Sequence, residues 1–276
     1  MSEAARVTKL STFIGHITDI KADENRTLFF RGHADLEYVA LPTIFRVNPN
    51  DEQSLRYVEK EQELFHDIIM RCPEEFLSCN SAFDHLVKMQ HYGLPTRLLD
   101  ITSNPLVALY FACCTLAGKG AKGKDGEVLI YSIPNDEIKF YNSDTVSVVS
   151  NLSKMSSEFN FENVNHHKSY LHAIREEKPY FADEIKHEHL NSVLCVKPKL
   201  DNRRIVKQSG AFLLFGMGVR KNDPTGIPEN YRSESIKKIE IPKSAKLNIL
   251  NELKNVAISE ATLFPEIDYV ARSLRA

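Results

Sequence analysis

The segment from Asn104 to Gly118, NPLVALYFACCTLAG, places an almost unbroken apolar run behind a polar start. Asn104 is a preferred N-cap residue, Pro105 suits the first helical position, and Gly118 suits the position just after a helix. The sequence therefore predicts a helix over residues 105–117. Because this helix is apolar on nearly every side, we expect most of it to lie in the core.

Around this helix, segments with strand periodicity and segments with helix periodicity do not alternate regularly. A doubly wound parallel sheet requires such alternation, so we predict an α+β fold with a mixed, largely antiparallel sheet and flanking helices. The expected strands cover residues 27–33, 127–134, 192–198, 210–216 and 236–242. The expected helices, besides 105–117, cover residues 5–21, 51–71, 80–91, 243–256 and 260–274, with a helical turn at 202–208.

The chain of 276 residues is interpreted as a single domain. Its N-terminal helix covers 5–21, and its core covers 24–139 and 190–274. The part between, residues 140–190, is polar, rich in histidine and weakly periodic, and we interpret it as an insertion or lid.

Composition narrows the functional classes. The net charge is −2, so no strong overall field attracts nucleic acid or membrane. No apolar run approaches the roughly 20 residues needed to span a bilayer, and the N-terminus lacks the apolar stretch of a signal peptide. The five cysteines show no C-x-x-C spacing, so reduced thiols in a cytoplasmic protein are expected.

Two motifs that suggest ligands are weak. The loop GKGAKGKD resembles a phosphate-binding loop, but Asp125 stands where Ser or Thr would bind magnesium, and the loop leads from a helix into a strand. His187 and His189 flank Glu188, yet neither a strand nor a helix would bring these two histidines to one ion. We therefore predict no metal site.

Two other stretches are harder to explain by structure alone. Arg31 lies in an apolar strand, where a buried guanidinium needs either an anion or a carboxylate partner, and the sequence leaves both alternatives open. Residues 94–104 contain six polar side chains at the start of the apolar helix, where free amide groups and the helix dipole favour an anion. Capping explains one of these side chains well, but not six.

Three segments together resemble the FRG domain family. They are FFRGHADLEYVALPTIFR, QHYGLPTRLLDITSNPLVALYFAC and NRRIVKQSGAFLLFG, and the closing TLFPEIDYVARSL is similar to the tail seen after this domain. The resemblance covers roughly residues 24–274, apart from the 140–190 segment. The family was named without a defined function, so the resemblance alone implies no activity.

A more distant similarity links the chain to the ADP-ribosyltransferase fold. Those enzymes carry an Arg on a first strand, a Ser/Thr-rich segment that leads into a helix, and a Glu or Gln motif at a late strand. The similarity implies catalytic roles for Arg31, Thr102, Ser103 and Gln208. It also implies NAD as a substrate, bound by a second group of residues: Gly32, His33, His91, Tyr92, Arg97, Asp100 and Asn104.

In one respect the chain departs from the transferase pattern. Gln208 stands where the transferases usually carry a glutamate, and an amide can hydrogen-bond a ribose hydroxyl but cannot offset a cation. Asp100, Glu176, Glu177 or a histidine of the 140–190 segment would then have to supply the missing charge.

Three functional hypotheses remain from the sequence. In the first, the protein binds NAD and transfers ADP-ribose to a macromolecular target, a protein or a nucleic acid, or hydrolyses NAD, as a toxin or anti-phage defence factor. In the second, the same pocket is a non-catalytic module that binds a nucleotide or a partner. In the third, Arg203, Arg204 and Lys207 serve a nucleic-acid binder or modifying enzyme, against which the net charge argues.

Overall fold

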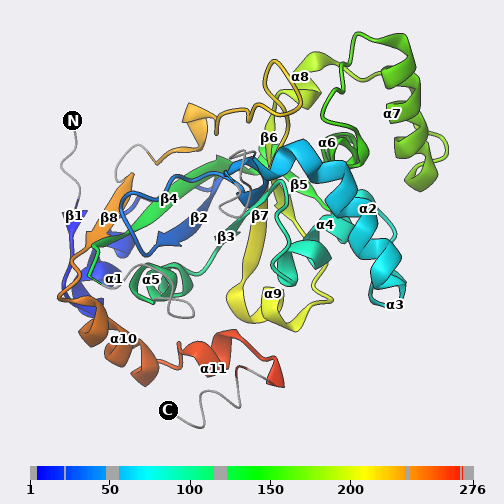
Figure 1. Cartoon of the computed structure of the whole chain (residues 1–276). Coiled ribbons are helices and arrows are strands. Elements are labelled where there is room, and N and C mark those ends of the chain that lie inside the picture. The colour runs from blue at the N-terminus through cyan, green and yellow to red at the C-terminus, as the bar shows by residue number, and fades with distance from the viewer. Residues whose placement is uncertain are drawn as a thin grey trace.

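A computed structural model describes residues 5–21, 23–47, 56–114, 123–233, 237–267 and 269. Its centre is an eight-stranded sheet in the order β1-β8-β4-β2-β3-β7-β6-β5 (Figure 1). The two edge pairs, β1 with β8 and β5 with β6, are parallel, and the pairs between them are antiparallel. The predicted α+β class with a mixed, largely antiparallel sheet is therefore confirmed. The strands are β1 (Ala5–Arg6), β2 (Arg26–His33), β3 (Leu98–Thr102), β4 (Gly126–Pro134), β5 (Ile138–Phe140), β6 (Val193–Lys197), β7 (Gly210–Phe215) and β8 (Lys238–Ile241).

The helices form two groups, one toward each end of the sheet (Figure 1). One group packs on β8, β4 and β2 and consists of α1 (Leu10–Thr18), α5 (Pro105–Cys113), α10 (Lys246–Asn255) and α11 (Glu260–Leu263). The other packs on β3, β7 and β6 and consists of α2 (Glu61–Arg71), α3 (Pro73–Phe76), α4 (Ala82–His91), α6 (Asp144–Asn151), α7 (Val164–Glu177), α8 (His187–Leu190) and α9 (Arg203–Gln208). A third apolar cluster lies beneath the short 3-10 turns η1 (Thr43–Phe45), η2 (Tyr57–Lys60) and η6 (Glu229–Tyr231). Two further 3-10 turns are η4 (Asn135–Glu137) and η5 (Leu152–Lys154).

The segment 140–190 supplies part of the apolar core. Val149 on α6 and Tyr170 on α7 are fully buried in the cluster that also contains Phe83 of α4. The polar composition of the segment therefore reflects its outer surface, while its inner face packs like any other part of the domain.

Several predicted boundaries change. The predicted helix over 5–21 is wrong at its start, because β1 precedes α1 and pairs with β8 across more than 200 residues of sequence. The predicted closing helix over 260–274 is interrupted: α11 covers Glu260–Leu263, and Pro265 disfavours helix at the residue before it. Residues 267 and 269 are again helical, and residues 268 and 270–274 lie outside the described residues. Helix α5 ends at Cys113, and the predicted stop at Gly118 lies outside the described residues.

Other predictions fall partly outside the described parts of the chain. Of the predicted helix over 51–71, residues 51–55 are not described, and the rest forms η2 and α2. Most of the loop resembling a phosphate-binding loop is likewise not described. In the described ranges, no helix combines the length and the apolar character that crossing a membrane requires.

Candidate functional site

A cavity of about 380 Å³ lies between the two groups of helices, where β2 and β3 separate. These two strands pair at Phe30 and Thr102, whereas β2 pairs with β4 along its whole length. Alternation along β2 places Arg31 and His33 on the face opposite to Phe30 and Gly32. All four nevertheless line the cavity, because the separation of the strands opens the sheet at this point.

Arg31 spans this separation with its side chain. Its Nη1 donates to the backbone carbonyl of Asp100 at 2.6 Å, and its Nε donates to Nε2 of His33 at 3.0 Å. Burial lowers the pKa of Arg31, and the nearby Asp100 opposes that effect. Among the described residues, no carboxylate lies within ion-pair distance of the guanidinium, which favours a bound anion over a structural ion pair as its partner.

His33 is almost fully buried behind Arg31. Its Nδ1 lies 3.1 Å from Oε1 of Glu127, its cross-strand partner on β4. Burial lowers the pKa of His33, the hydrogen bond to Glu127 opposes this, and Arg31 lowers it further. The histidine therefore supports the arginine from inside the protein.

The cavity carries an excess of positive charge. Arg46 and Arg204 line it together with Arg31, and Asp100 is the one carboxylate among the described lining residues. Nε and Nη2 of Arg46 donate to the carbonyl of Leu41, and Arg204 lies over the ring of Phe264 at 4.6 Å. In the parts of the chain that the structure describes, none of these three arginines forms an ion pair. Such an arrangement suits an anionic ligand.

Asp100, by contrast, is held through its side chain. Gln90 on α4 donates to its Oδ2 at 2.9 Å, and Thr96 in turn donates to Gln90. The carboxylate is exposed and lies at the cavity wall beside Arg31.

Gly32 has a structural explanation that sequence reasoning missed. A Cβ there would lie 2.0 Å from the carbonyl oxygen of Ala108 and 2.6 Å from the amide nitrogen of Ala112, both on α5. The lack of a side chain at Gly32 therefore allows α5 to pack closely against β2.

The polar residues at the start of α5 have different roles. Thr102, which lines the cavity, donates to the carbonyl of Gln208 at 2.6 Å and accepts from the amide of Asn104 at 3.0 Å. Asn104 caps α5 by accepting from the amide of Leu106. Ser103 is exposed, and neither Ser103 nor Asn104 is among the cavity-lining residues. Thr102 is thus the residue of this group that joins β3 to the cavity and to α9.

Gln208 lies at the cavity at the C-terminal end of α9. Its Nε2 donates to the carbonyl of Leu263 at the end of α11, at 3.2 Å. Ser209 follows with a φ of 47°, in the left-handed region, and begins the turn into β7. The amide group of Gln208 therefore connects the C-terminal segment to the site.

Arg97 lies outside the cavity, although the similarity to ADP-ribosyltransferases implied that it binds NAD. It is fully buried, donates from Nη2 to Oε2 of Glu61 at 2.7 Å, and donates from Nη1 to the carbonyl of Gly216 at 2.9 Å. Nζ of Lys221 is 2.9 Å from the same carboxylate oxygen. Arg97 is thus part of a buried ion cluster between α2 and the end of β7.

His91 and Tyr92, at the end of α4, differ in their position relative to the cavity. His91 lines the cavity and forms an ion-pair contact with Glu266 at 3.6 Å, while burial lowers its pKa. Tyr92 is exposed and donates to Glu75, so it lies outside this cavity.

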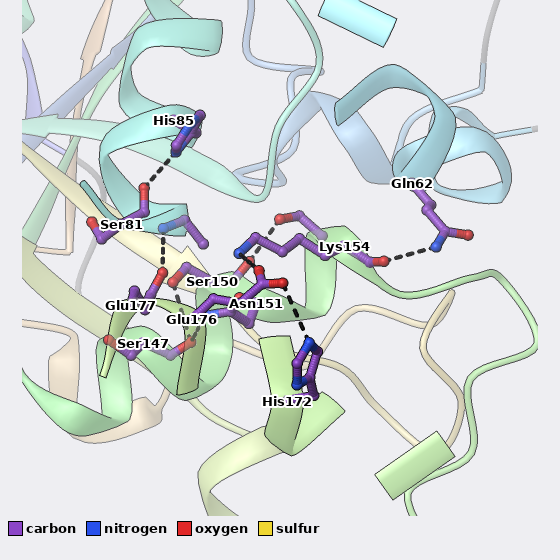
Figure 2. Close-up of polar contacts among 12 residues, drawn as sticks. Gln62, Ser81, His85, Ser147, Ser150, Asn151, Lys154, His172, Glu176 and Glu177 are labelled. Atoms are coloured by element: carbon purple, nitrogen blue, oxygen red, sulfur yellow. Dashed lines mark hydrogen bonds and ion pairs between the residues drawn. The ribbon is translucent and has the colours of Figure 1, made fainter. Parts of the chain in front are cut away.

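The two glutamates of α7 that were candidates for the missing charge contact other residues of the same helical group (Figure 2). Glu176 contacts Lys154 and His172, and Glu177 accepts from the amide of Ala82 at the start of α4. No described residue of the 140–190 segment lines the cavity. Of the carboxylates considered from the sequence, Asp100 is the one at the site.

Two contributors, Arg46 and Glu127, were missed from the sequence, and a third, Arg204, was considered there only as a nucleic-acid contact. Arg46 ends the LPTIFR stretch within the FRG-like motif, and Arg204 lies in NRRIVKQ, so both were present in segments already singled out. Glu127 gave no such signal, because its role depends on pairing with His33 across two strands.

Comparison with protein families matches residues 26–119 to the FRG domain. This range includes β2, Arg46 and the whole of the stretch from β3 through α5, and it supports the FRG family predicted from the motifs. Comparison with curated proteins and with solved structures finds no match.

Proposed function

We propose that the cavity binds NAD through its pyrophosphate and uses it for ADP-ribosyl transfer to a macromolecule or for NAD hydrolysis. The observation that supports this most directly is the group of three arginines without ion-pair partners among the described residues, at one cavity. A pyrophosphate carries the two negative charges that such a group would neutralise. The volume lies within the range of small-molecule sites, and Phe30, Phe111 and Phe212 supply apolar walls for flat rings.

In this proposal Asp100 performs the electrostatic role that Gln208 cannot. Breaking the bond to nicotinamide leaves positive charge on the ribose, which a nearby carboxylate stabilises. Asp100 lies at the cavity beside Arg31, so one wall would hold phosphate while the adjacent carboxylate faces the ribose. An enzyme that consumes NAD in this way would suit a toxin or an anti-phage defence role.

A matched pair of substitutions on α9 tests the proposal. Arg204 lines the cavity, whereas its neighbour Arg203 is exposed and does not. We expect Arg204→Ala to weaken NAD binding by about 10-fold or more, since a charge-assisted hydrogen bond contributes about 1.5–3 kcal/mol. Arg203→Ala should bind as the unmodified protein does. Calorimetry that detects no NAD binding at all, or equal losses in both variants, would contradict the proposed site.

Turnover is tested separately through Asp100. Nicotinamide release should fall strongly in Asp100→Asn, while NAD affinity changes little, because the amide keeps the shape and loses the charge. If Asp100→Asn released nicotinamide at the unmodified rate, Asp100 would have no catalytic role.

A second candidate, a non-catalytic nucleotide-binding module, has a specific observation in its favour. Gln208 is uncharged, and its amide is already bonded to Leu263. Binding of NAD or ADP-ribose without any nicotinamide release in the unmodified protein would select this module over the enzyme.

A further inference from the structure

We propose that Glu127 and His33 form a buried positioning pair, which holds the Arg31 guanidinium toward the cavity with His33 neutral and its ring proton on Nδ1. The purpose of the pair rests on the proposed function of the cavity, whereas its geometry stands independently. Neither side chain is required to touch the ligand. Their role is to fix the group that does.

The hydrogen-bonding capacity of arginine determines the state of His33. Nε of a guanidinium is a donor only, so Nε2 of His33, 3.0 Å away, must present a lone pair. The ring proton then lies on Nδ1, which is 3.1 Å from Oε1 of Glu127, and the carboxylate accepts it. Turning the ring over would place Cε1 against Arg31 and Cδ2 against Glu127 and would lose both hydrogen bonds, so the two partners also fix the orientation of the ring.

Glu127 is suited to keep this arrangement. It is 5% exposed and lies directly across from His33 in the pairing of β2 with β4. Nζ of Lys238 on β8 donates to its other oxygen at 3.4 Å, so both carboxylate oxygens have partners. A charged acceptor beside Nδ1 makes the proton on that nitrogen more stable.

The pair helps to fix the orientation of the Arg31 guanidinium. Nε of Arg31 is held by His33 and Nη1 by the carbonyl of Asp100, whereas Nη2 has no hydrogen-bond partner among the described residues. Two sides of the planar group are thus fixed by protein atoms, and one remains for an anion. A guanidinium held in this way loses less side-chain freedom when it binds an anion.

Protonation of His33 would disrupt the pair. A proton on Nε2 would point at the N–H of Arg31, so two donors would face each other. Other groups that face the histidine are Arg46 after η1, the ring of Tyr38, which is nearly perpendicular to it with the two ring centroids 6.2 Å apart, and Lys238 through Glu127. A further cation, Lys246, donates to the carbonyl of Ala34, the residue that follows His33. Burial opposes protonation most strongly, the nearby cations oppose it further, and Glu127 favours it, so His33 stays neutral near pH 7 and gains a proton only in acid. Because that proton would disrupt the pair, we expect anion binding to weaken in acid.

The first test requires no ligand. Nitrogen NMR of the unmodified protein at pH 7 should show His33 neutral with its proton on Nδ1. It should also show slow exchange of the Arg31 Nε proton. A charged His33, or a proton on Nε2, would overturn the proposal, and so would rapid exchange of the Arg31 proton.

The second test compares variants by the affinity of ADP-ribose between pH 7.5 and pH 5. In the unmodified protein, affinity should fall by about tenfold toward acid, as expected for loss of one charge-assisted contact. His33→Gln should retain the affinity at pH 7.5 without the acid loss, because an amide can accept from Arg31 and donate to Glu127 but does not titrate. His33→Ala should be weak throughout.

His85→Gln is the matched control. His85 is half-buried and, like His33, has a pKa lowered by burial, but it bonds to the carbonyl of Ser81 and does not line the cavity. This variant should retain the acid loss of the unmodified protein. Equal weakness of His33→Gln and His33→Ala, with both folded by circular dichroism, would refute the pair. If no protein binds ADP-ribose, the proposed function fails, and the NMR result alone decides the state of the pair.

Discussion

Replacing Gly32 with alanine would separate two explanations for the glycine of the Phe30-Arg31-Gly32 motif. The structure assigns Gly32 to the packing of β2 against α5, because an added Cβ would meet the carbonyl oxygen of Ala108 at 2.0 Å. The alternative, which the sequence suggested, is that Gly32 leaves room for a ligand. The first explanation predicts a loss of stability, and the second predicts a loss of binding by a stable protein.

The size of the stability loss follows from the contacts. Cβ atoms are essentially never found within 3.0 Å of such neighbours, so β2 and α5 would have to move apart by about 1 Å. The atoms in contact are backbone atoms of a helix, so no flexible side chain can give way. Val107, Ala108, Leu109 and Ala112 on α5 are fully buried, and a shift of the helix would loosen their contacts. We expect a loss of about 3 kcal/mol or more in the free energy of unfolding, at or beyond the upper end of typical overpacking.

Gly15→Ala supplies the control for this measurement. Gly15 lies within α1, and a Cβ there would meet no atom within 4 Å. Alanine should stabilise that helix by about 0.5–1 kcal/mol. Urea unfolding monitored by circular dichroism measures both changes. A Gly32→Ala protein that unfolds at the unmodified urea concentration, yet no longer binds NAD, would refute the packing explanation.

Three further substitutions test the buried ion cluster and the cap of α5. Glu61→Gln should cost about 3–5 kcal/mol, because it leaves Arg97 and Lys221 buried without a counter-charge. Burial raises the pKa of Glu61, but Arg97 and Lys221 more than offset this and lower the pKa overall. The stabilisation from Glu61 is therefore present above its ordinary pKa of 4.5 and is lost as the pH falls through the lower pKa of the folded state. Urea unfolding at several pH values measures this loss, and a Glu61→Gln protein as stable as the parent would contradict the assignment. Asn104→Ala should lower the free energy of unfolding by about 1 kcal/mol, because α5 loses its N-cap. Ser103→Ala should change it by less than about 0.5 kcal/mol, because Ser103 is exposed. Equal losses in thermal unfolding would contradict the different roles assigned to these neighbours.

Local pattern predicted most of the fold. The N-cap and apolar content of α5, the alternation in β2 and the apolar runs of β4 and β7 are properties of contiguous residues, and the structure confirms these elements. The start of the chain was harder, because Ala5 and Arg6 form a strand through pairing with distant β8. Two residues carry no periodicity of their own, so long-range pairing decides their structure.

The site shows the same division. Arg31 and Arg97 both lie in motifs next to apolar strands, and sequence reasoning assigned both to the ligand. Only Arg31 reaches the cavity, because Glu61, from a helix 36 residues earlier in the chain, neutralises Arg97 in the core. Whether a buried arginine has a carboxylate partner depends on tertiary structure, which the local sequence does not contain.

The separation of β2 from β3 also decides which arginine gives the clearest measure of cavity charge. Arg31 occupies the carbonyl of Asp100 at the point where the two strands cease to pair, so its removal leaves that acceptor without this partner as well as removing a charge. A binding loss in an Arg31 variant therefore mixes electrostatics with local stability. Arg204 has no side-chain hydrogen bond to the described residues and lies over the ring of Phe264, so its removal leaves no polar group unpaired. For this reason the comparison of Arg204 with its exposed neighbour Arg203 decides whether positive charge in the cavity binds an anion, and the Arg31 variant then shows how much the fixed geometry adds.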